Sequence, residues 1–118
     1  MRAAIPLLCA VALAGCGGDE PTARARDGSV RIVLDDFSIR PQTVRGDAGR
    51  MRFEVVNRGR AGHNFRLRRG PGEPLKLTTL LPGDSESIAA ELPAGDYRMV
   101  CTVANHEELG MYGTLVLR

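Results

Sequence analysis

The feature that most constrains this chain is an alternation of apolar and polar residues with a period of two. This is the spacing of a β-strand that buries one face. Met51, Phe53 and Val55 alternate with charged residues, and Phe65 and Leu67 repeat the pattern. By this criterion we expect strands at residues 30–34, 51–55, 63–67, 87–92, 97–103 and 114–117.

Turn-forming residues separate these stretches, at residues 45–49, 57–59, 81–84 and 92–96. In the last of these, Pro93 fixes a turn dihedral and Gly95 tolerates a positive φ. About seven to eight short strands with frequent turns indicate an all-β protein, a β-sandwich. Only residues 73–80, opened by Pro74, could instead form a short helical turn.

Length and composition set limits on the class of protein. The 118 residues suffice for one folded domain, and 43% of them are hydrophobic, which argues against disorder. The formal net charge of +2 and the lack of an aromatic-rich basic stretch exclude a nucleic-acid-binding class. With no Trp, two Tyr and three Phe, the core must rely on aliphatic residues and Met.

The N-terminal sequence is typical of a secretory signal. Arg2 is followed by an apolar stretch that is too short to span a bilayer. The sequence Leu-Ala-Gly-Cys at residues 13–16 resembles the lipobox of bacterial lipoproteins, in which the Cys is lipidated. We therefore expect a lipoprotein signal peptide at residues 1–15 and a lipid anchor on Cys16, holding the protein on the outer or periplasmic face of a membrane. The alternative is an ordinary cleaved signal with a chance Cys.

The polar stretch that follows Cys16 lacks hydrophobic periodicity. Residues 17–29, GGDEPTARARDGS, are rich in charged and turn-forming residues. We therefore expect residues 16–29 to form the lipidated Cys and a flexible linker, with the folded domain at residues 30–118.

The three cysteines have different expected fates. Cys9 leaves with the signal and Cys16 takes lipid, so Cys101 remains alone in an oxidising compartment, where structural cysteines normally pair. A metal ion that holds Cys101 as a bound thiolate would explain the unpaired residue.

The loop after the strand at residues 97–103 carries three metal-binding residue types at even spacing. Four residues separate Cys101 from His106, and four more separate His106 from Met111. The alternation places His63 and Cys101 on core faces, and a sandwich can bring His63 to this loop. A single inward His or Met is more often a core residue than a ligand. Here, however, the two His residues of the chain and Cys101 can converge.

Two imidazoles, one thiolate and a weak axial Met describe a blue-copper electron-transfer site. Other uses of the same residues stay open. Zinc could occupy Cys and His ligands, although an axial Met does not favour it. A Cys-His nucleophile pair is conceivable, but nothing suggests an oxyanion hole. An extracytoplasmic copper chaperone or buffer is the main alternative function.

The stretches CTVANHEELGMYGTLVL and NRGRAGHNFRL resemble the cupredoxin family of small blue copper proteins, such as its auracyanin-like members. The resemblance implies a Greek-key β-sandwich that binds one copper ion as Cu(I) or Cu(II). By position, His63, Cys101 and His106 would be equatorial ligands and Met111 the axial ligand. Asn64 would hydrogen-bond the residue after the Cys, Thr102.

The resemblance further implies a monomeric electron carrier, not an enzyme, whose partners are redox proteins such as cytochromes or membrane oxidase complexes. Where many small relatives have Pro-Gly before the loop His, this chain has Ala104-Asn105, and we expect Asn105 to adopt the left-handed conformation that Gly would use. Charged residues near the ligands, either Glu107 and Glu108 or the arginines within residues 58–69, could dock a partner or simply be solvated.

Overall fold

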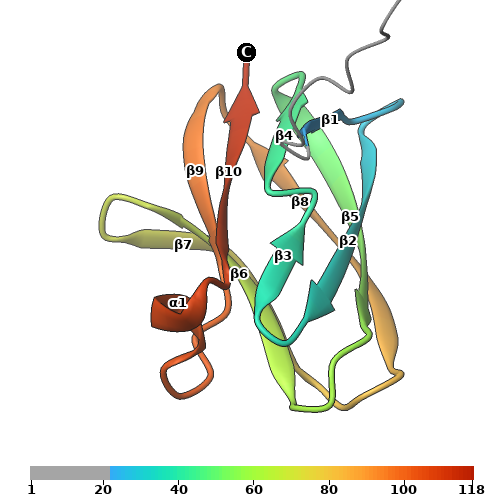
Figure 1. Cartoon of the computed structure of the whole chain (residues 1–118). Coiled ribbons are helices and arrows are strands. Elements are labelled where there is room, and N and C mark those ends of the chain that lie inside the picture. The colour runs from blue at the N-terminus through green and yellow to red at the C-terminus, as the bar shows by residue number, and fades with distance from the viewer. Residues whose placement is uncertain (1–21) are drawn as a thin grey trace, which may run out of the picture.

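A computed structural model describes residues 22–118 of the chain, and the signal peptide and Cys16 lie outside these residues. The described part contains ten strands and one short helix, shown in Figure 1. The strands are β1 (Thr22–Arg24), β2 (Ser29–Asp35), β3 (Ser38–Arg40), β4 (Thr43–Gly46), β5 (Gly49–Asn57), β6 (His63–Arg69), β7 (Gly72–Leu80), β8 (Ser85–Leu92), β9 (Gly95–Val100) and β10 (Tyr112–Leu117). The helix α1 (His106–Leu109) lies between β9 and β10. No helix in residues 22–118 is long and apolar enough to cross a membrane.

The strands form two sheets that face each other. One has six strands in the order β1-β4-β10-β9-β6-β7, and the other has four in the order β3-β2-β5-β8. The chain passes repeatedly from one sheet to the other, so β2 pairs with β5 in parallel and β4 pairs with β10 in parallel. The predicted all-β Greek-key sandwich is therefore confirmed, with more strands than the sequence indicated.

The alternation seen in the sequence decides which side chains fill the space between the sheets. Met51, Phe53 and Val55 of β5 are buried, while the charged residues between them are exposed. Phe65 of β6 packs its ring against Phe53 of the opposite sheet, with the ring centroids 5.5 Å apart. Aliphatic side chains and Met supply most of the remaining core, as the composition predicted.

The N-terminal boundary of the folded domain differs from the prediction. Residues 22–29 were expected to belong to the flexible linker, but β1 pairs in parallel with β4, and Ala23 lies opposite Val44. Backbone hydrogen bonding also continues beyond β1, because the Ala25 N–H donates to the Arg45 carbonyl at 2.8 Å. An edge strand needs only backbone partners, so its polar sequence carried no periodic signal.

Two other segments depart from the sequence reading. Residues 73–80, which could have formed a helical turn, belong to strand β7, whose Leu75 and Leu77 alternate inward and pair with β6. Pro74 is tolerated there because β7 is an edge strand. The strand expected at residues 97–103 ends at Val100, so Cys101 begins a loop.

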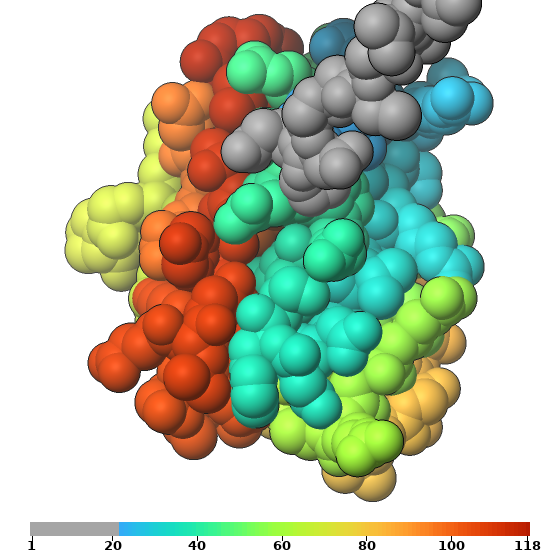
Figure 2. Space-filling view, viewed as in Figure 1, coloured from blue at the N-terminus to red at the C-terminus, as the bar shows by residue number. Residues whose placement is uncertain are grey.

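Three connections meet at one end of the sandwich. They are the turn between β2 and β3, the loop between β5 and β6, and the long loop from β9 to β10 that contains α1 (Figure 1). Figure 2 shows the α1 segment lying directly against the β2–β3 segment on the molecular surface. The Arg58 N–H also donates to the Leu34 carbonyl at 2.8 Å, which ties the β5–β6 loop to β2. This end holds the candidate site.

Candidate metal centre

The chain's two His residues and Cys101 converge at this end of the sandwich. The Cys101 Sγ lies 3.9 Å from the His63 Nδ1 and 3.7 Å from the His106 Nδ1, and the two Nδ1 atoms are 3.2 Å apart. The residues are almost fully shielded from solvent, at 0% exposed for His63 and Cys101 and 8% for His106. Three such donors, all within 4.8 Å of one another, form a group that could hold a metal ion.

Each of these residues stands at the boundary of a regular element. His63 is the first residue of β6, Cys101 directly follows β9, and His106 is the first residue of α1. The backbone hydrogen bonds between strands limit the motion of a residue at a strand end. Residues at such positions suit a site of fixed geometry.

The long loop is closed by two backbone hydrogen bonds at Met111. The Cys101 N–H donates to the Met111 carbonyl at 3.1 Å, and the Met111 N–H donates to the His106 carbonyl at 3.1 Å. Met111 is itself 0% exposed. The structure thus places the fourth predicted ligand in the buried shell next to the other three, while its role as a ligand stays a prediction.

Comparisons with known proteins bear on the fold that carries this group. No protein-family model matches the sequence, and no curated protein matches it significantly. Among solved structures, reduced auracyanin from the photosynthetic bacterium Roseiflexus castenholzii superposes with a TM-score of 0.72 at 18% identity, covering 80% of this chain and 98% of that one. Reduced rusticyanin gives a TM-score of 0.67 at 18% identity, with coverages of 86% and 87%. The chain has the cupredoxin fold.

A larger protein also contains this fold. The Cu-containing nitrite reductase (NirK) from Thermus scotoductus SA-01 superposes with a TM-score of 0.64 at 17% identity. The match covers 87% of this chain but only 29% of the reductase. The cupredoxin fold therefore occurs both as a small protein and as one part of an enzyme. Whether this chain is an electron carrier or an enzyme must be argued from the residues of its site, because the fold alone does not distinguish them.

The segments that carry His63 and Cys101 are joined by the residues that follow them. The Asn64 Nδ2 donates to the Thr102 Oγ1 at 2.8 Å, and the Thr102 N–H donates to the Asn64 Oδ1 at 2.8 Å. Alternation alone would have placed Asn64 on an outer, solvated face, yet it is only 5% exposed. The contact is the one that the cupredoxin resemblance implied.

The turn before the loop His differs from the expectation. Asn105 was expected to take the left-handed conformation, but its φ is −98°. The positive φ belongs to Ala104 instead, at 43°. The tight turn is therefore made one residue earlier, and Asn105 leads directly into α1.

Asp36 is a part of the site that sequence reasoning missed. Its Oδ1 lies 2.6 Å from the His63 Nε2, and the N–H groups of Arg60 and Ala61 donate to its carboxylate at 2.8 and 3.3 Å. The hydrogen bond from the Arg60 N–H, together with that from His63, lowers the pKa of Asp36 against the opposing effect of burial. The only signal in the sequence was the Asp35-Asp36 pair at the end of β2, and Asp36 is 27 positions away from His63.

His106 is covered on its outer side by Phe37. The two ring centroids are 4.8 Å apart, and Phe37 is 38% exposed. Burial lowers the pKa of His106, and the nearby His63 lowers it further, while Asp36 acts in the opposite direction. A depressed pKa favours the neutral imidazole, which is the form that ligates metals.

The charged residues near the site pair with each other. Arg68 donates to both carboxylate oxygens of Glu107 at 3.0 and 3.2 Å, and Arg98 approaches the same carboxylate at 3.8 Å. Arg66 and Arg68 also bond Glu73 on β7. Glu107 thus pairs with Arg68 and Arg98, and the arginines of the 58–69 segment that pair here are Arg66 and Arg68.

Proposed function

We propose that this protein is a type 1 copper protein that carries single electrons between larger redox proteins. The observation that carries the proposal is the buried convergence of one thiol and two imidazoles, His63, Cys101 and His106, with Met111 in the adjoining shell. Two His, one Cys and a weak axial Met form the donor set of blue-copper sites. Auracyanin A is described as a blue copper protein and rusticyanin as a copper protein, which supports the same reading.

The residues present fit a copper ion by the chemistry of their donors. Thiolate and imidazole suit both Cu(I) and Cu(II), and a thioether favours Cu(I). When bound, the copper would supply a reversible one-electron couple. Such a couple is fast only when the ligands hold nearly the same positions in both oxidation states.

The chain's own contacts supply this rigidity. Asn64 and Thr102 fix the two ligand segments against each other, and the Met111 backbone closes the loop that holds Cys101 and His106. The core around Cys101 and His63 excludes water, because both residues are 0% exposed. The residues would therefore hold a copper ion in a dry and preformed site.

An electron carrier fits these residues better than an enzyme. The only two His residues of the chain both belong to this group, so a second His-rich centre of the kind that a copper enzyme needs has no ligands to draw on. A copper chaperone or buffer is the alternative function. Delivery of a metal to another protein favours exposed ligands, whereas His63 and Cys101 are buried on a rigid scaffold.

Further parts of the proposal rest on the sequence. We place the protein on the extracytoplasmic face of a membrane, held by a lipid on Cys16, as a monomer that exchanges electrons with cytochromes or membrane oxidase complexes. The support is the signal-like N-terminus with its Leu-Ala-Gly-Cys ending, and a short segment between Cys16 and β1 that would keep the domain close to the bilayer.

The deciding experiment is a titration of the purified protein with Cu(II), followed by visible and electron paramagnetic resonance spectra and then by reduction. The proposal predicts an intense thiolate-to-copper band that saturates at one equivalent, a small copper hyperfine splitting, and reversible bleaching. A colourless protein that binds Cu(I) tightly would instead establish metal delivery or storage.

A further inference from the structure

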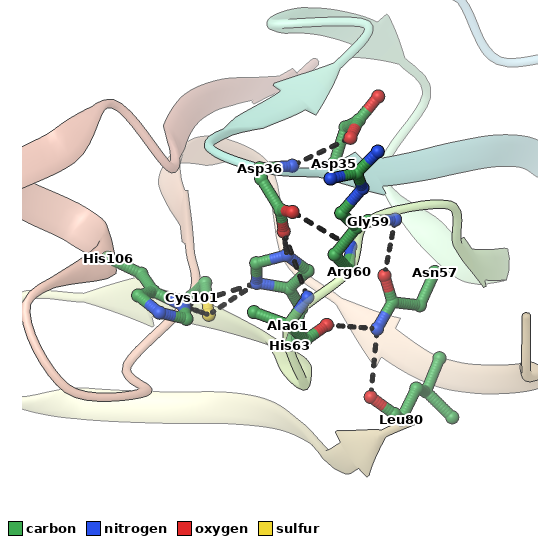
Figure 3. Close-up of polar contacts among 10 residues, drawn as sticks. All are labelled: Asp35, Asp36, Asn57, Gly59, Arg60, Ala61, His63, Leu80, Cys101 and His106. Atoms are coloured by element: carbon green, nitrogen blue, oxygen red, sulfur yellow. Dashed lines mark hydrogen bonds and ion pairs between the residues drawn. The ribbon is translucent and has the colours of Figure 1, made fainter. Parts of the chain in front are cut away.

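The imidazole of His63 is held from both sides. Figure 3 shows its Nδ1 facing Cys101 and His106 and its Nε2 facing Asp36. The His63 Nε2 and the Asp36 Oδ1 are 2.6 Å apart. The His63 side chain is 0% exposed and that of Asp36 is 24% exposed. Asp36 therefore lies between the buried His63 ring and the protein surface, and it contacts the ring by a hydrogen bond.

The hydrogen-bonding chemistry determines which ring nitrogen of His63 carries the proton. The backbone N–H groups of Arg60 and Ala61 can only donate, and both point at the Asp36 carboxylate. An ionised carboxylate only accepts, so the His63 Nε2 must be the donor in its 2.6 Å contact. In the neutral ring this leaves the Nδ1 with a free lone pair directed at the site.

The loop between β5 and β6 is built to hold the carboxylate in place. The buried Asn57 donates its side-chain amide to the carbonyls of Ala61 and Leu80, each at 2.9 Å, and accepts from the Gly59 N–H at 2.8 Å. These bonds fix the backbone that presents the Arg60 and Ala61 N–H groups (Figure 3).

Gly59 leaves the space in which Asp36 and His63 meet. A Cβ added at this residue would collide with the Asp36 Oδ1 and would lie 2.7 Å from the His63 Nε2. Any side chain here would therefore push the carboxylate away from the ring. The absence of a side chain at Gly59, like the amide contacts of Asn57, serves the pairing of Asp36 with His63.

We propose that Asp36 is the positioning residue for His63, fixing its tautomer and orientation and lowering the reduction potential of the site by placing a negative charge beside a ligand. The inference rests on the proposed copper-binding function. A carboxylate that accepts from the far nitrogen of a ligating imidazole raises the basicity of that ligand. A more basic ligand and a nearby anion both stabilise Cu(II) relative to Cu(I).

The test compares the full-length protein with Asp36→Asn and Asp36→Ala. An Asn cannot accept from all three donors at once, because one carboxylate oxygen is replaced by an NH₂ group. We expect a higher midpoint potential in both variants and, in Asp36→Ala, a loss of about 10- to 100-fold in Cu(II) affinity. Asp35→Asn is the matched control, since it removes the same charge one residue away while keeping the acceptor for the Asp36 N–H. Its midpoint potential should shift much less.

A second readout needs no copper. In the metal-free protein, nitrogen chemical shifts of the His63 ring report which nitrogen is protonated, and we expect the Nε2–H tautomer in the wild type and in Asp35→Asn. Asp36→Ala should lose this preference. Gly59→Ala is an independent test of the same tautomer preference, because it keeps the Asp36 carboxylate but displaces it from the His63 ring.

The outcomes separate the two proposals. A wild-type protein without a blue site would overturn the proposed function, while the tautomer would still show whether Asp36 orients His63. A blue wild type whose metal-free ring carries the proton on Nδ1 would overturn the inference without any variant. Asp36→Asn and Asp35→Asn with the same potential would also overturn it.

Discussion

Asn64 and Thr102 exchange two hydrogen bonds of 2.8 Å between the neighbouring strand ends of β6 and β9, one between side chains and one from the Thr102 N–H to the Asn64 side chain. They join the residue after His63 to the residue after Cys101, which are 38 positions apart in the sequence. The pair therefore holds the start of β6 and the end of β9 together at the point where the candidate ligands meet.

Asn64→Ala should destabilise the metal-free protein by about 1–3 kcal/mol, because it removes both bonds and leaves a shielded N–H without a partner. Urea unfolding of the metal-free form measures this directly. Thr102→Val, which removes only the hydroxyl, should cost less than Asn64→Ala. Equal stability of Asn64→Ala and the wild type would show that the pair does not hold the two segments together.

Cys101→Ser should abolish the visible band of the copper-loaded protein, because a hydroxyl is a far poorer soft donor than a thiolate. Met111→Gln should keep a copper site with a lower reduction potential, since Gln can replace the weak axial ligand. Visible spectra and redox titration distinguish the two variants. A Cys101→Ser protein that stays blue would refute the assignment of the thiolate.

Glu73→Gln should lower the free energy of unfolding at neutral pH and have little effect in acid. Burial alone would raise the pKa of Glu73, but hydrogen bonds from Arg66 and Arg68 outweigh it and hold the pKa below its ordinary 4.5. A carboxyl with a lowered folded-state pKa contributes stability above its unfolded pKa, and this contribution disappears as the pH falls through the folded value.

The measurement for Glu73→Gln is urea unfolding of variant and wild type at pH 7 and at an acidic pH below the lowered pKa of Glu73, where the carboxyl is protonated. Glu91→Gln is a suitable control, because Glu91 is exposed and makes no ion pair within residues 22–118. A stability difference for Glu73→Gln that is the same at both pH values would argue against the ion pairs as its cause.

Cys16→Ser should release the protein from membranes, since an acyl chain can no longer be attached to the expected N-terminal residue of the mature protein. Fractionation of cells into membrane and soluble material, with metabolic labelling by a fatty acid, tests this expectation. Cys9→Ser serves as the control and should leave both labelling and fractionation unchanged. Wild-type protein that takes up no fatty acid would favour an ordinary cleaved signal.

The alternation of apolar and polar residues was enough to predict most strands that bury side chains. Together with the spacing of Cys, His and Met, it also predicted which residues meet at the site. Alternation showed that His63 and Cys101 point inward, because a half-buried strand has a period of two. The spacing of Cys101, His106 and Met111 then placed three donor residues in one loop. Strand β1 buries no side chain fully, so alternation could not separate it from the linker. Residues 73–80 do alternate, with Leu75 and Leu77 buried in β7, but Pro74 left a short helical turn open there.

Tertiary structure alone decided the surroundings of the site. Asp36 reaches His63 only because the β2–β3 turn and the β5–β6 loop meet at one end of the sandwich, and Gly59 matters only because of that meeting. The left-handed residue of the ligand loop is Ala104, although the local sequence favoured Asn105. Periodicity reports whether a residue faces inward, whereas pairing between distant segments depends on how the two sheets and their loops pack.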